Sequence, residues 1–187
     1  MTSSPEYGVY YERSDYIGVW RRVAIDFVDV FVAIAVSLSA TIVLSLIISD
    51  DDRLLLATLI AWVAVWFGYF VLLKRSSFRT LGYILGRARI VNLQGTTPSI
   101  ASLFLRLLFA MLGPLNLLFD LFWIPSDPCR QALRDKFAHT YVIRRFASPS
   151  ATGRIGYMPY TILGGSFIFQ EVRQSQQVEP PVAVTPS

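Results

Sequence analysis

The sequence has only one cysteine and one histidine, so little in it can form a disulfide or bind a metal. Cys129 has no second cysteine to pair with, which excludes an internal disulfide. His139 has no second histidine, cysteine or glutamate at ligand spacing, so no metal site is expected. The sequence also lacks a glycine-rich phosphate loop and a nucleophile elbow. We therefore predict that the protein is not an enzyme and uses no cofactor.

Charged residues are scarce as well, at 16% of the chain, whereas hydrophobic residues make up 53%. The mean hydropathy of +0.48 is typical of a membrane protein rather than a soluble domain. The net charge of +4 is modest, and the basic residues follow the edges of apolar runs. Nucleic-acid binding is therefore not expected. A secretory signal peptide is not expected either, because the first apolar run is too long and lacks a clean cleavage site.

Two apolar runs predict transmembrane helices over about residues 23–48 and 54–73. A bilayer core needs roughly 20 apolar helical residues, and both runs are long enough. Because the linker 49–53 is short and acidic, we expect a helical hairpin. Arginines and lysines gather before the first run and after the second, so the positive-inside rule places the N-terminus in the cytoplasm. We expect a multi-pass protein of the plasma (inner) membrane.

A third apolar stretch, residues 100–124, has two possible interpretations. Gly113-Pro114 interrupts it near its middle, and it also contains Arg106 and Asp120. A single kinked span would place the following basic segment outside the cell, against the charge rule. Two short helices that enter the membrane and return would keep that segment in the cytoplasm. We favour the returning hairpin, although a Pro-kinked span is common in membranes.

Two short segments support the returning hairpin, because they can pair only if they lie on one side of the membrane. Residues 87–92 end in a turn signal, and residues 140–143 are rich in β-branched and aromatic side chains. The predicted fold is thus an all-α membrane protein, a small transmembrane helical bundle with a short cytoplasmic β-strand pair. We expect a disordered tail over 1–15, a transmembrane domain over 16–145, and a glycine- and aromatic-rich segment with a disordered tail over 146–187.

Charged side chains at the start of the first span form the candidate site. Arg22, Asp26 and Asp29 are spaced at i, i+4 and i+7, so they lie on one helix face. Ionisable groups inside a span cost about 2.5–3.5 kcal/mol each at its centre, and they persist where they face other helices or a wet cavity. Two carboxylates within about one turn can share a proton or bind one small cation. We favour a structural lock, in which Arg22 pairs with Asp26 or Asp29.

Three further charged residues, Arg106, Asp120 and Asp135, extend the candidate cluster. If residues 100–124 fold back, Asp135 can reach Arg22 or Arg106, and Asp120 can approach Arg106. In a straight helix the fourteen residues between Arg106 and Asp120 would span about 21 Å at 1.5 Å per residue, which is beyond contact. We expect these residues to form structural ion pairs. Cys129, in a loop near the membrane, is a weaker candidate for acylation.

Several motifs occur in a distinctive order. Trp20-Arg21-Arg22 opens the first span, and Asp29 follows seven residues after Arg22. The other residues of these motifs follow in chain order: Thr80, Gly82, Gly86, Ile90, Val91, Pro98, Ser99, Leu105, Arg106, Leu133, Arg134, Asp135, Thr140, Val142 and Ile143. Over about residues 16–145 this order resembles the RDD family of membrane proteins, named for an arginine and two aspartates. Tyr83 and His139 depart from the family pattern, since they replace a lysine and a glycine.

The resemblance implies a small helical membrane domain, but it says little about activity. Transport of an unknown ligand has been proposed for the family, and some members are described as sodium–proton antiporters. We predict a non-enzymatic, oligomeric structural or accessory membrane component. Its expected partners are the lipid bilayer and either a second copy or another membrane protein. The alternative is a small-cation/proton antiporter that uses Arg22, Asp26 and Asp29.

Overall fold

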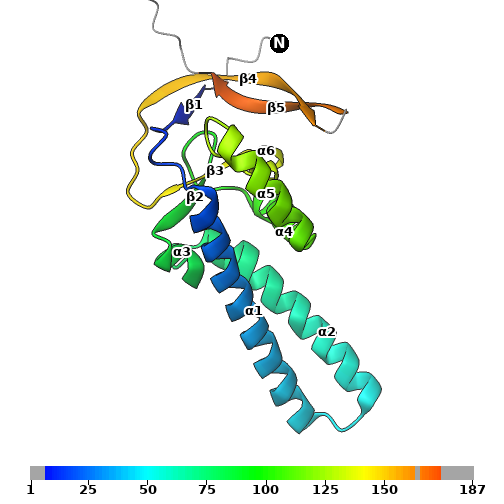
Figure 1. The fold of residues 1–187 in the computed structure, drawn as a ribbon. Coiled ribbons are helices and arrows are strands. Elements are labelled where there is room, and N and C mark those ends of the chain that lie inside the picture. Colours follow the sequence, from blue (N-terminus) through cyan, green and yellow to red (C-terminus); the bar gives the residue numbers. More distant parts are fainter. Residues whose placement is uncertain (1–6, 163–164, 174–187) are drawn as a thin grey trace, which may run out of the picture.

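Two long helices project from a compact group of strands and short helices (Figure 1). The computed structural model describes residues 7–162 and 165–173. Helix α1 (Val19–Ile47) is followed by α2 (Asp51–Phe67) and by a π-helical turn η1 (Gly68–Leu73) that continues α2. The Asp50 side chain accepts a hydrogen bond from the Arg53 amide at 2.9 Å and so caps α2. The predicted helical hairpin is therefore present.

The hairpin is long and has an apolar surface. The 29 residues of α1 extend about 44 Å at 1.5 Å per residue, which exceeds the thickness of a bilayer core. Both α1 and the continuous helix Asp51–Leu73 are long and apolar enough to cross a membrane. The buried residues of α1 lie on one face, while none of the described α2 residues is buried. The outer faces of the hairpin thus present apolar side chains to their surroundings.

The third apolar stretch consists of two separate helices, α4 (Ile100–Ala110) and α5 (Pro114–Ser126). Gly113, between them, has φ = +58°, a left-handed conformation that suits glycine. The Ser99 hydroxyl caps α4 by accepting from the Ser102 amide at 3.0 Å. Both helices return to the short helix α6 (Leu133–Phe137) and make ion pairs there. Residues 100–124 are therefore two helices that fold back, as in the returning interpretation, rather than one continuous helix.

The predicted strand pair is confirmed. Strand β2 (Ala88–Asn92) pairs antiparallel with β3 (Thr140–Arg144), and Val91 lies opposite Tyr141. After β2 the Asn92 side chain accepts hydrogen bonds from two following backbone amides, at 3.1 and 2.8 Å, and so closes the turn. Helix α3 (Leu81–Leu85) precedes β2 and packs beside α1.

A second sheet was not predicted, so the all-α description is imprecise. Strand β1 (Tyr7–Tyr10) pairs with β4 (Ala151–Ile162), which pairs with β5 (Gly165–Arg173). Tyr7–Tyr10 falls in the tail that we expected to be disordered, while residues 1–6 and 174–187 lie outside the described residues. Gly153 is required because a Cβ there would overlap the carbonyl oxygen of Arg173. Such glycines interrupt the apolar pattern by which strands are found.

The sheets and the short helices α3 and α6 together form what we call the cap. Its core is an apolar cluster in which Tyr16 and Tyr141 meet edge to face, with ring centroids 5.5 Å apart. Val91 and Leu93 belong to the same cluster, and Val172 of β5 joins it from the second sheet. A second apolar cluster, in which Ile25 of α1 meets Tyr83, Ala88 and Val142, packs the cap against the hairpin.

Candidate functional site

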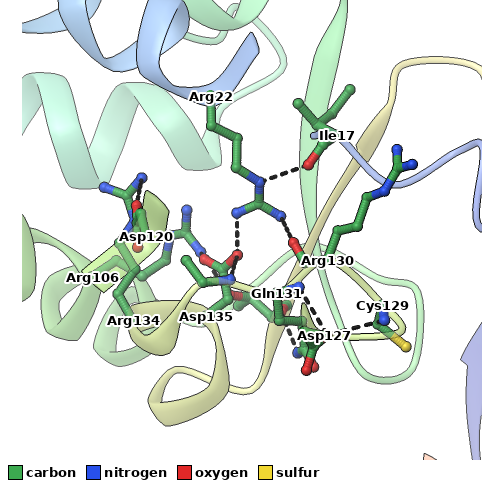
Figure 2. Close-up of polar contacts among 12 residues, drawn as sticks. Ile17, Arg22, Arg106, Asp120, Asp127, Cys129, Arg130, Gln131, Arg134 and Asp135 are labelled. Atoms are coloured by element: carbon green, nitrogen blue, oxygen red, sulfur yellow. Dashed lines mark hydrogen bonds and ion pairs between the residues drawn. The ribbon is translucent and has the colours of Figure 1, made fainter. Parts of the chain in front are cut away.

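Charged side chains from four helices converge where the hairpin meets the cap (Figure 2). We call this set the charge network; its members are Arg22, Asp26, Arg106, Asp120, Arg134 and Asp135. Arg22, Asp26, Arg106 and Asp120 come from otherwise apolar helices, whereas Arg134 and Asp135 come from the short polar helix α6. Each was predicted to belong to the site except Arg134, which was noted only as part of a motif.

Asp135 lies at the centre of the network and is fully buried. One carboxylate oxygen forms an ion pair with Arg22 of α1, and the other forms an ion pair with Arg106 of α4. The carboxylate also accepts the Ala132 amide at 3.1 Å. Donors on three sides fix the direction of this carboxylate. Asp135 therefore joins α1 and α4 to α6.

Arg22 uses the rest of its guanidinium to hold the backbone of the cap. Its Nε donates to the carbonyl oxygen of Ile17 at 2.9 Å, and a second nitrogen donates to the carbonyl oxygen of Arg130 at 2.7 Å. A planar guanidinium can make such divergent contacts at once, which an ammonium cannot. Arg22 was expected to pair with Asp26 or Asp29 on its own helix. That expectation is wrong, because Asp135 faces it from α6.

Arg134 makes the second connection of the network. It forms ion pairs with Asp26 of α1 and with Asp120 of α5, the latter at 3.2 Å. Burial lowers the pKa of the Arg134 guanidinium, but the Asp26 and Asp120 carboxylates outweigh burial and raise the pKa above its usual value. Asp120 was expected to pair with Arg106. The two do come to the same region, but Arg134 is the ion-pair partner of Asp120.

Asp29 belongs to a different set of contacts. It is fully buried, and its carboxylate accepts from the Thr80 hydroxyl and the Gly82 amide, both at 2.7 Å. The Tyr69 hydroxyl lies at 3.1 Å, and the Lys74 ammonium lies at 3.5 Å. Asp29 therefore fixes α3 and the end of η1 against α1. Asp26 and Asp29 have separate partners, so they do not form one shared carboxylate pair.

The cap contains a further buried ion cluster that the sequence did not reveal. Lys136 of α6 forms ion pairs with Asp127 and with Glu171 of β5, and its ammonium lies 3.1 Å from the Tyr160 hydroxyl. Burial lowers the pKa of Lys136, but the two carboxylates outweigh it, so the net pKa is raised. Burial raises the pKa of Tyr160 to about 12. This cluster ties the second sheet to α6, and hence to the charge network.

A cavity of about 440 Å³ lies beside the charge network. Its charged lining comes from Arg22, Asp26, Lys74, Arg106, Asp120 and Arg134, and the remaining lining is largely apolar. Two buried atoms here, Asp120 Oδ1 and Arg134 Nε, have no hydrogen-bond partner within the described chain. No group of three potential metal ligands occurs among residues 7–162 and 165–173. The lining therefore suits a ligand that has both a polar group and an apolar portion.

Comparison with known families gives one match. The model of the RDD family matches residues 16–139, about two thirds of the chain. The matched region includes Arg22, Asp29 and Asp135, and it ends before β3. No curated protein and no solved structure matches the chain.

Proposed function

The chain belongs to the RDD family, and we propose that it is a non-enzymatic membrane protein in which the charge network locks a transmembrane hairpin to the cap. Family membership and two apolar helices of spanning length fit a membrane protein. We place it in the plasma (inner) membrane as a multi-pass protein with its N-terminus in the cytoplasm, because the basic residues flank the apolar runs. Its proposed role is that of a structural or accessory component.

One observation carries this proposal: the carboxylates and guanidiniums of the charge network pair across helices. Asp135 binds Arg22 and Arg106, while Arg134 binds Asp26 and Asp120. Removing one partner of a buried ion pair costs about 3–5 kcal/mol, because the other charge is left uncompensated. A site that binds and releases an ion would have to break such a pair in every cycle, at this cost in free energy. A permanent structural lock keeps its ion pairs intact and has no such cost.

The exposed apolar faces of the hairpin support assembly in the membrane. Leu46 and Ile47 at the end of α1, and Leu55 and Val63 on α2, are all more than half exposed. Two spanning helices enclose no path across a bilayer by themselves. We therefore propose that the hairpin contacts lipid on part of its surface and a second copy or a partner membrane protein on the rest.

A cation/proton antiporter is the second candidate, and one feature favours it. Asp26 lines the cavity, and 29% of its side chain is exposed, in contrast to fully buried Asp29 and Asp135. A carboxylate in that position could exchange a proton for a small cation if Arg134 moved away. The two candidates differ in whether Asp26 supports ion flux or only stability.

Sodium-driven proton flux in liposomes distinguishes these candidates. The purified full chain would be compared with Asp26→Asn and with Asp52→Asn, which alters an exposed carboxylate at the start of α2. The lock predicts no flux above that of empty liposomes for any of the three proteins. It also predicts a lower unfolding temperature for Asp26→Asn than for Asp52→Asn. Flux by the wild type that disappears only in folded Asp26→Asn would overturn the lock and establish the antiporter.

A further inference from the structure

Beyond its structural role, we propose that the cavity beside the charge network binds one amphiphile with a zwitterionic head group. The head group carries a primary ammonium and a phosphate, as in ethanolamine phospholipids. Nothing in the family match assigns a ligand to this cavity. The inference rests on the shape of the cavity, on the charge of the network, and on the two unpaired buried atoms.

The cavity joins a polar end to the apolar surface of the hairpin. Val30 and Phe27 of α1 line it, and Phe27 is 73% exposed, so the cavity reaches the outer surface there. Leu103, Leu107 and Ala110 of α4 supply further apolar lining. The volume of about 440 Å³ falls within the range of roughly 300–1,000 Å³ that is usual for small-molecule sites. An acyl chain can lie along these walls and extend out of the cavity on the side that faces lipid.

Four basic and two acidic side chains line the polar end, and the charges balance because Asp29 and Asp135, which do not line the cavity, form ion pairs with lining residues. This balance selects against a head group with net charge. Four basic and four acidic side chains form the charge network and its Asp29 neighbourhood: Arg22, Lys74, Arg106, Arg134, Asp26, Asp29, Asp120 and Asp135. An anionic lipid would add a buried charge without a partner, which is unfavourable in a medium of low polarity. A zwitterion adds one charge of each sign and leaves the balance unchanged.

The two unpaired atoms define what the head group must supply. Asp120 Oδ1 is an acceptor without a donor, and Arg134 Nε is a donor without an acceptor. Asp120 and Arg134 are only 3% and 5% exposed, and both line the cavity. Buried polar atoms in proteins nearly always form hydrogen bonds, so we expect a ligand to form a hydrogen bond with each of these two atoms. A primary ammonium can donate to Asp120, and a phosphate oxygen can accept from Arg134.

This requirement separates ethanolamine from choline lipids. The trimethylated nitrogen of choline has no N–H, so it cannot donate a hydrogen bond to Asp120. A glycerol head group lacks the positive charge, although its hydroxyls can donate. We therefore expect ethanolamine phospholipids to bind more tightly than choline and glycerol phospholipids.

Native mass spectrometry of the full chain tests the proposal directly. The protein, purified in detergent, would receive an equimolar mixture of dioleoyl phosphatidylethanolamine, phosphatidylcholine and phosphatidylglycerol. A charge-assisted hydrogen bond gained only by ethanolamine predicts about 10-fold more of its one-lipid adduct than of the choline adduct. Equal occupancy by the three lipids would overturn the proposal. So would equally tight binding of soluble phosphoethanolamine, because the apolar walls would then have no role.

Two substitutions on the same helix locate the lipid. Ala110→Phe places a large side chain in the cavity, whereas Ala101→Phe makes the same change at an exposed position that does not line it. We expect the ethanolamine adduct to disappear in the first variant and to persist in the second. Asp120→Asn should retain a lipid but lose the preference for ethanolamine. If Ala110→Phe does not fold, the relative amounts of the three lipid adducts in the wild type and in Asp120→Asn still test the proposal.

Discussion

Replacing Asp135 by asparagine should destabilise the protein strongly, because one buried carboxylate neutralises two guanidiniums. Arg22 and Arg106 are both buried and contact different oxygens of Asp135. Asparagine keeps the size of the side chain and one acceptor oxygen, so the change removes charge with little change in packing. Leaving a buried charge without its partner costs about 3–5 kcal/mol. With two arginines affected, the upper part of this range is expected.

That free energy translates into a readily measured change in unfolding temperature. A chain of 150–250 residues loses about 2–4 °C per kcal/mol, so the expected fall is roughly 6–20 °C. Thermal unfolding in detergent, followed by tryptophan fluorescence, measures it for wild type, Asp135→Asn and the exposed control Asp52→Asn. The control should stay within about 2 °C of the wild type, as surface substitutions usually do. A fall for Asp135→Asn no larger than that of the control would refute the reasoning.

Three other predictions concern the backbone and the single thiol. Gly82→Ala should lower the unfolding temperature, because the added Cβ would lie 2.6 Å from a carboxylate oxygen of Asp29 in α1. Gly68→Ala is the control: its added Cβ would have no atom within 4 Å, so the unfolding temperature should stay unchanged or rise. The pKa of the Cys129 thiol is raised by burial to about 11, so maleimide labelling at pH 7.5 should be slow and should accelerate as the pH approaches 11. Labelling at pH 7.5 as fast as that of an exposed Ser77→Cys thiol in a Cys129→Ser background would contradict this. His139 has φ = +52°, so His139→Gly should raise the free energy of unfolding by about 0.5–1 kcal/mol, and a loss measured by denaturant titration would count against strain at this residue.

Local patterns allowed much of the fold to be predicted. The two apolar runs and the acidic linker identified the helical hairpin, since apolar runs of this length predict long helices and a short linker predicts that they are antiparallel. The β-branched residues of β2 and β3, together with the turn after Asn92, identified the strand pair. The second sheet was missed because glycines break the alternation in β4, and because β1 and β4 pair across more than 140 residues. No local pattern reports a pairing over that distance.

The members of the candidate site were predicted, but its connectivity was predicted only in part: the pairs of Asp135 with Arg22 and Arg106 were expected, and the other pairs were not. Helical spacing placed Arg22, Asp26 and Asp29 on one face, which suggested pairs within α1. In the structure Arg22 and Asp26 contact α6, whereas Asp29 contacts α3 and η1, and the partner of Arg22 lies 113 residues away. Lys136 and Glu171 escaped notice for the same reason, because neither stands in a recognisable spacing with the other. The link between Arg22 and Asp135 followed from the expected fold-back of residues 100–124, together with the family motifs.

A double-mutant cycle between Arg22 and Asp135 tests the lock most directly, because this pair joins α1 of the hairpin to α6 of the cap. The free energies of unfolding of wild type, Arg22→Gln, Asp135→Asn and the double variant would be measured by titration with a denaturing detergent. Residues in direct contact within one network show coupling of about 0.5–3 kcal/mol, whereas independent sites add within about 0.3–0.5 kcal/mol. The account predicts coupling of at least about 1 kcal/mol, because the second substitution no longer breaks an intact pair. Additive effects of the two substitutions would contradict the claim that Asp135 holds α1 of the hairpin to the cap.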